Sequence, residues 1–74
     1  MSEKLPVLSG KQIIKVLAKI GFLPVRQKGS HVFPRHVDGR RTVVPLHEEV
    51  NKSTVMDIIE QTKLTKGEFL KLLR

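Results

Sequence analysis

The sequence contains no cysteine, tryptophan or tyrosine and only three phenylalanines among its 74 residues. Without cysteine it has no disulfide framework and no thiolate metal site, so a reducing cytoplasm is the simpler setting. The shortage of aromatic residues predicts a mainly aliphatic core. A chain of this length supports one compact domain, residues 1–74, which buries only about 60% of the surface that its unfolded chain exposes.

Long apolar segments are also missing. No hydrophobic run approaches the ~18 residues that a membrane-spanning helix needs. Residues 1–6 carry no hydrophobic signal core and are expected to begin a short N-terminal arm over residues 1–8. The sequence therefore predicts a cytoplasmic protein with no membrane partner.

Acidic residues are scarce compared with basic ones. Fourteen Lys and Arg against seven Asp and Glu give a formal net charge of +7. An excess of this size on so small a body attracts polyanions, of which nucleic acid is one. Anionic membranes and acidic proteins respond to the same field, and the simplest alternative is a solvated protein that happens to be basic.

A helix is predicted over residues 10–20. Ser9 and Gln12 form a capping-box pattern, and Ile13, Leu17 and related apolar residues recur at helical spacing. Gly21 stands where a left-handed residue commonly ends a helix. Lysines line the opposite side of this helix, as on a solvated face.

Three strands are predicted next, over residues 22–27, 31–37 and 41–46. A turn at residues 28–30 joins the first two, and Asp38-Gly39 is a strong hairpin signal between the second and third. The expected result is a three-stranded antiparallel meander.

Two helices are predicted to close the chain. Asn51 or Ser53 caps the first, which ends near Lys63, while Thr65 and Glu68 form a capping box for the second. The predicted fold class is α+β, in the order α-β-β-β-α-α, with the helices covering one face of the sheet.

The segment Arg26-Gln27-Lys28-Gly29-Ser30-His31 carries the most suggestive chemistry. Around one predicted turn it places two cations, a permissive glycine, a hydroxyl and an imidazole. Cations offset the charge of a phosphodiester, and a histidine moves protons near neutral pH. On spacing alone, a solvated hairpin turn with a merely polar histidine explains the same residues.

A resemblance gives this segment more weight. Gly21-Phe22, residues 26–31, Asp38-Gly39-Arg40 and residues 42–47 resemble, in order and spacing, the HicA family of mRNA interferase toxins. The likeness extends through residues 54–59 and 64–70, and so covers roughly residues 9–74. It implies a fold like that of double-stranded-RNA-binding domains, cleavage of mRNA, and neutralisation by a HicB-type antitoxin.

The sequence departs from the family pattern at a few positions. Pro34 and Val37 stand where the family more often has an aromatic residue and a proline, and Ser53 stands where glycine is frequent. A proline in the middle strand of a meander removes a ladder hydrogen bond. We therefore expect either a bulge or a break in pairing at Pro34.

By the resemblance, His31 is the catalytic histidine of a metal-independent endoribonuclease that needs no cofactor. The RNA-binding candidates surround it in the predicted sheet and its turns: Arg26, Gln27, Lys28, Gly29, Ser30, Arg35, Arg40 and Arg41. His47 is the candidate accessory residue, with a loop-fixing role as its alternative. His36 is more readily structural or RNA-contacting. The three histidines show no H-x-H or H-x-x-x-H spacing, so no metal site is predicted.

Two other functions use the same basic residues. A non-catalytic RNA-binding module would bind phosphates and A-form shape with Lys and Arg alone. A pure interaction protein would dock an acidic partner by charge complementarity. His31 beside Gly29-Ser30 separates the enzyme from both, because a binding protein needs no imidazole there.

Overall fold

The computed structural model describes residues 5–73, so residues 1–4 of the expected arm lie outside the described residues. The described residues contain three helices and three strands in the predicted order α-β-β-β-α-α. The elements are α1 Gly10–Ala18, β1 Leu23–Lys28, β2 His31–Arg35, β3 Val44–Pro45, α2 Lys52–Gln61 and α3 Lys66–Leu72.

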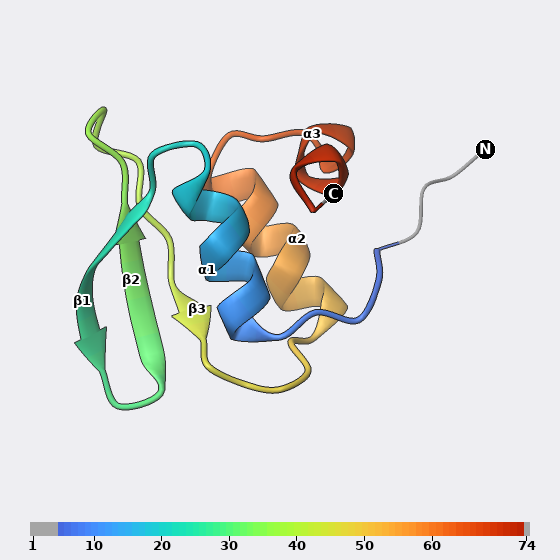
Figure 1. The fold of residues 1–74 in the computed structure, drawn as a ribbon, viewed down its shortest axis with the longest axis horizontal. Coiled ribbons are helices and arrows are strands. Elements are labelled where there is room, and N and C mark those ends of the chain that lie inside the picture. Colours follow the sequence, from blue (N-terminus) through green and yellow to red (C-terminus); the bar gives the residue numbers. More distant parts are fainter. Residues whose placement is uncertain (1–4, 74) are drawn as a thin grey trace.

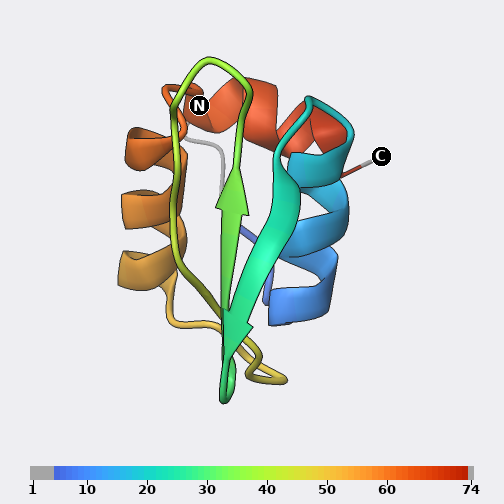
Figure 2. The same ribbon diagram turned by 90° about the vertical axis from the view of Figure 1, so that its left-hand side faces the viewer.

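The strands form one antiparallel sheet in the order β1-β2-β3. Helices α1, α2 and α3 lie together on one side of this sheet (Figure 1). Seen from the other side, β1 and β2 stand in front of the helices with nothing drawn over them (Figure 2). The predicted α+β fold with helices on one face is therefore confirmed, and no element of residues 5–73 covers the opposite face of the sheet.

Helix α1 begins as the sequence predicts. The Ser9 hydroxyl accepts from the Gln12 backbone N–H at 3.2 Å, and the Gln12 side chain accepts from the Ser9 N–H at 2.9 Å. The helix ends at Ala18, two residues before the predicted end, because a turn over residues 19–21 closes on Gly21 with φ of 95°.

Close backbone packing joins α1 to the end of β3. The Gly10 N–H donates to the His47 carbonyl at 2.9 Å. A Cβ at Gly10 would lie 2.1 Å from the Pro45 carbonyl oxygen, so no larger residue fits without movement of the backbone. This contact fixes residues 45–47 beside the first turn of α1.

Pro34 disturbs the sheet on both sides, as expected for a proline in a middle strand. On the β1 side a bulge separates the pairs Pro24–Pro34 and Gln27–Val32, so two residues of β1 stand opposite Phe33. On the β3 side the Thr42 N–H donates to the Pro34 carbonyl at 3.2 Å, but proline has no N–H to return the bond.

The third strand is shorter than predicted for this reason. Regular pairing is limited to Val44 and Pro45, with an isolated bridge between Arg35 and Arg41, instead of a strand over residues 41–46. The second strand ends at Arg35 and not at residue 37, because the Gly39 N–H donates to the His36 carbonyl at 2.9 Å and closes a turn over residues 36–39. The predicted Asp38-Gly39 turn is present, with φ of 99° at Gly39.

The core is aliphatic with two phenylalanines, as the composition predicts. Phe22 and Phe69 are fully buried among side chains from the helices, β3 and the N-terminal segment. Leu5 and Leu8 are also buried, and Leu8 bridges to Val50, so the described part of the arm packs on the body of the protein. The remaining members of this cluster are Ile13, Val16, Leu17, Val44, Val50, Val55, Ile58 and Ile59.

The closing helices follow the predicted signals. Asn51 is the N-cap of α2, although its side chain makes no capping bond, and α2 ends at Gln61 near the expected position. Lys63 then adopts φ of 62°, a left-handed conformation that costs an ordinary residue about 1–2 kcal/mol. The capping box of α3 is complete, with Thr65 and Glu68 bonded to each other's backbone N–H.

Candidate functional site

Lys28 and His31 are paired at the tip of the β1–β2 hairpin, where a turn of Gly29 and Ser30 joins the strands. Gly29 has φ of 58°, which fits the first central position of a type II′ turn. The Gln27 side-chain amide donates to the Gly29 carbonyl at 3.1 Å and steadies the turn. This tight turn brings an ammonium group and an imidazole side by side on neighbouring strands.

The His31 imidazole is exposed, and no hydrogen bond to it is found within residues 5–73. Its backbone is nevertheless well fixed, because β2 is the middle strand and His31 also pairs with Pro45 of β3. The Leu46 N–H donates to the Ser30 carbonyl at 2.6 Å and ties the turn to the next segment. A rigidly held but solvent-accessible imidazole is suited to contacting a large substrate.

His47 lies at the same end of the sheet, directly after Leu46. It is exposed, and its carbonyl accepts the Gly10 N–H at 2.9 Å. This backbone bond accounts for a loop-fixing role without involving the imidazole. The proposed accessory role of the side chain stays a prediction.

Alternation along β2 divides its side chains between two faces. Val32 and Pro34 are buried towards the helices, whereas His31 and Arg35 are exposed and Phe33 is half-buried on the other face. Residues two apart in a strand share a face at about 6.6–6.8 Å spacing. His31, Phe33 and Arg35 therefore form a row on the uncovered face of the sheet.

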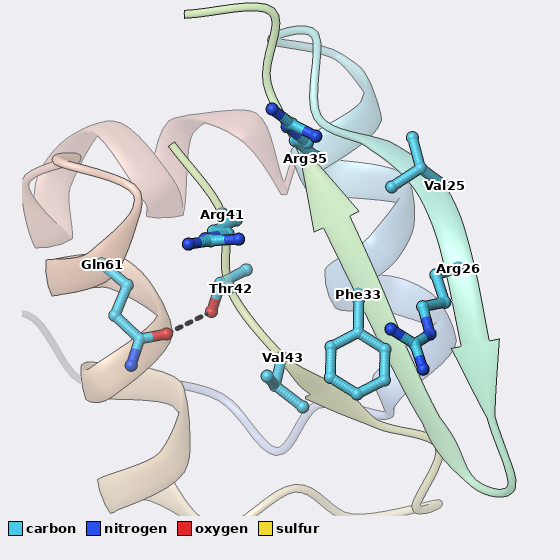
Figure 3. Close-up of a pocket in the computed structure, with 8 residues that line it drawn as sticks. All are labelled: Val25, Arg26, Phe33, Arg35, Arg41, Thr42, Val43 and Gln61. Carbon is cyan, nitrogen blue, oxygen red and sulfur yellow. Dashed lines mark hydrogen bonds between the residues drawn. The ribbon is translucent and has the colours of Figure 1, made fainter. Parts of the chain in front are cut away.

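The bulge in β1 adds two more side chains beside Phe33. Val25 and Arg26 both occupy the stretch opposite Phe33, and both line a hollow there. The Arg26 guanidinium carbon lies 5.9 Å from the centre of the Phe33 ring, within the range of a cation–π contact. Figure 3 shows the Arg26 side chain beside this ring.

The other wall of the hollow comes from the segment before β3 and from α2. Val43 lies next to Phe33, and the Thr42 hydroxyl is bonded to the Gln61 side-chain oxygen (Figure 3). Arg41 also lines the hollow, and its backbone forms an isolated β-bridge with that of Arg35. We call this surface, made by Arg26, Phe33, Arg35 and Arg41 with Val25 and Val43, the arginine face.

Arg35 and Arg41 are exposed and stand opposite each other on this face. Among the described residues neither has an acidic partner, since Asp38 pairs with the Arg40 guanidinium and its other close contact is to the His36 ring. Like charges directly opposite each other in a sheet are destabilising. The arrangement therefore provides two cations that are available to an anion.

Arg40 is held by intramolecular contacts on the helix side. Its guanidinium donates to Asp38 Oδ2 at 2.7 Å and to the Thr62 carbonyl, and it lies over the Phe22 ring at 5.1 Å. The backbone N–H of Arg40 also donates to Asp38, which lowers the pKa of that carboxyl. His36 is likewise structural in its contacts, with its Nδ1 accepting from the Asp38 N–H and its ring 5.1 Å from Phe22.

The structure thus separates the predicted residues into groups. Arg26, Arg35 and Arg41 gather on the arginine face, Lys28 and His31 lie at the hairpin tip, and Arg40 is turned away. Phe33 was not predicted to belong to a site, because a phenylalanine in a strand ordinarily signals core. The period of two that starts at His31 is the signal that places it on the outer face.

Comparisons with known proteins agree with the sequence resemblance. The family profile described as the HicA toxin of bacterial toxin–antitoxin systems matches residues 10–64. No curated protein is similar enough in sequence to count as a match. No helix in the described part of the chain is long and apolar enough to cross a membrane. Across residues 5–73, no cluster of three or more His, Asp or Glu is placed to hold a metal ion.

Proposed function

Because the chain belongs to the HicA toxin family of bacterial toxin–antitoxin systems, we propose that it is an endoribonuclease that cleaves mRNA with His31 as its catalytic residue. The observation that carries this proposal is the exposed His31 imidazole, paired with Lys28 across a two-residue turn on a basic sheet face. A protein that only bound RNA would need the cations and not the imidazole.

The proposed reaction is attack of a ribose 2′-OH on the adjacent phosphorus. The 2′-oxygen forms a bond to phosphorus as a base removes its proton, and the bond to the 5′-oxygen breaks as an acid protonates that oxygen. The products are a 2′,3′-cyclic phosphate and a 5′-hydroxyl. His31 performs one of these two proton transfers, a role typically worth ~10²–10⁴-fold in rate.

The phosphorane formed during attack carries extra negative charge. Lys28 is next to His31 in the hairpin and is the first candidate to offset it, together with Arg26 or Arg35 on the same sheet. The turn amides of Gly29 and Ser30 are further donors, since Gly29 has no Cβ to keep a phosphate away. His47, Lys28 or water is the partner for the second proton transfer.

A toxin of this kind needs an inhibitor, and a HicB-type antitoxin is the proposed partner. An acidic surface laid across Arg26, Lys28, His31 and Arg35 would pair with the charges that hold RNA and exclude the substrate directly. The opposite fields would also speed association. The uncovered sheet face supports this mode, because no element within residues 5–73 lies over it (Figure 2).

Incubation of the purified protein with a long RNA in EDTA, beside a His31→Ala variant, tests the proposed activity. We expect cleavage by the wild type and none by the variant. The same RNA left intact by both proteins, but bound by both, would show the non-catalytic RNA-binding module. An unbound RNA would point to a protein that docks acidic partners alone.

A further inference from the structure

Two features of the arginine face are energetically unfavourable when no ligand is bound: opposed like charges and exposed apolar side chains. Arg35 and Arg41 oppose each other without an acidic neighbour among the described residues. Between them and β1, the Phe33 ring is partly exposed, flanked by Val25 and Val43, which are 62% and 40% exposed. A ligand that relieved both features would need an anionic group and a flat apolar surface held close together.

A nucleotide has both parts, with a flat base joined through its sugar to a phosphate. A carboxylate peptide supplies the charge but not a flat ring at each acidic position. Aromatic side chains and Arg guanidinium planes are the usual stacking platforms for bases in proteins that bind single strands. Phe33 and Arg26, with 5.9 Å between the guanidinium carbon and the ring centre, supply one of each in the same hollow.

We propose that the hollow at Phe33 binds one unpaired RNA base, and that Arg35 and Arg41 pair with a phosphate flanking it. This inference rests on the proposed function and names the form of its substrate as single-stranded RNA. Only an unpaired, unstacked base presents its face to a side chain, because in a duplex both faces of each base are covered by neighbouring pairs.

The order of side chains along β2 sets how such a strand would lie. His31, Phe33 and Arg35 follow one another on the same face at about 6.6–6.8 Å intervals. A strand running along β2 would therefore place the reacting phosphate at His31, a neighbouring base on Phe33 and a phosphate further along the strand between Arg35 and Arg41. The base at Phe33 then positions the scissile bond, which makes Phe33 a positioning residue.

The absence of tryptophan in the chain permits a direct optical test. A Phe33→Trp variant carries a single tryptophan whose fluorescence a stacked base quenches. The matched control is Val37→Trp, at a side chain 96% exposed in the turn at the other end of β2. The probe is an all-2′-deoxy oligonucleotide, which lacks the attacking hydroxyl, offered as a single strand and as a duplex.

We expect the single strand to quench the fluorescence of Phe33→Trp and not that of Val37→Trp, and the duplex to quench neither variant. Phe33→Leu, which keeps an apolar side chain, should weaken single-strand binding by roughly 5- to 150-fold, the usual effect of losing one base-stacking contact. An abasic oligonucleotide should lose affinity for the wild type but not for Phe33→Leu.

Binding that saturates without quenching the fluorescence of Phe33→Trp, or a Phe33→Leu variant that binds the intact single strand as tightly as the wild type does, would overturn the inference. Stronger quenching of Phe33→Trp by an acidic peptide than by the single strand would also overturn it, in favour of a protein ligand. Cleavage of long RNA by the wild type, measured separately, tests the proposed function, so the two failures remain distinguishable.

Discussion

Arg35 and Arg41 face each other across an isolated antiparallel bridge, on the side of the sheet opposite the three helices of residues 5–73. Because like charges opposite each other destabilise a sheet, Arg35→Gln should raise the free energy of unfolding by about 0.2–1 kcal/mol while weakening RNA binding. Urea unfolding and RNA titration measure the two effects.

Arg40→Gln is the matched control for that substitution. It removes one charge as well, but it also removes the two guanidinium bonds, to the Asp38 carboxylate and to the Thr62 carbonyl. Its free energy of unfolding should therefore fall, by about 1–3 kcal/mol. A loss of stability in Arg35→Gln as large as in Arg40→Gln would contradict the view that Arg35 binds a ligand and does not stabilise the fold.

Lys28→Ala tests the phosphate contact at the hairpin tip. With one cation fewer on the RNA path, affinity should fall and its dependence on salt should become shallower, by about 0.7 in the slope of log K against log salt for a single strand. Lys71→Ala in α3 removes the same charge from the helical layer and should leave the slope unchanged. Equal salt-dependence slopes for the wild type, Lys28→Ala and Lys71→Ala would show that Lys28 does not contact the RNA.

The capping box of α3 predicts a specific response to acid. The Thr65 N–H and hydroxyl lower the pKa of Glu68 below its ordinary 4.5. A carboxyl whose pKa is lower in the folded state stabilises the fold above the unfolded pKa, and this contribution is lost as pH falls through the folded pKa. Glu68→Gln keeps the box but does not titrate, so it should lose less stability than the wild type when pH falls from about 7 to about 3.

Urea midpoints at the two pH values measure this difference. In a Thr65→Ala background, the proteins with Glu and with Gln at position 68 should lose more similar amounts of stability on acidification. The reason is that the hydroxyl that bonds the Glu68 backbone is gone and the capping box is broken. A wild type that tolerates acid better than Glu68→Gln would reverse the sign and refute the assignment.

Much of the fold could be predicted because helix caps and turns depend on residues that are close together in the sequence. Both capping boxes, the glycines of the turns and the element order are present as expected. The shortening of β3 depends on which residue of the third segment stands opposite Pro34, and that register is set by long-range pairing. The approach of Gly10 to Pro45 is hidden from sequence for the same reason.

The site was harder to predict than the fold. His31 and Lys28 are neighbours because a short turn joins them, and the sequence predicts that turn. Arg40 and Arg41 are adjacent in sequence but lie on opposite faces, one bound to Asp38 and the other open. Phe33 belongs to the outer face only because Val32 and Pro34 take the inner positions.

Inhibition by direct occlusion predicts where a HicB-type antitoxin binds. In the complex, His31 should be protected from chemical modification of its imidazole, and RNA should compete with the antitoxin for the toxin. Full modification of His31 within an intact complex would show that the antitoxin acts from another surface.

The cleavage rate at saturating protein separates chemistry from binding and tests the role of His31 most directly. Under single-turnover conditions, His31→Ala should cut RNA ~10²–10⁴-fold more slowly than the wild type, because proton transfer is lost. Its RNA affinity and far-UV circular dichroism should stay close to those of the wild type, because Arg26, Lys28 and Arg35 remain. Equal single-turnover rates for the two proteins would contradict catalysis by His31.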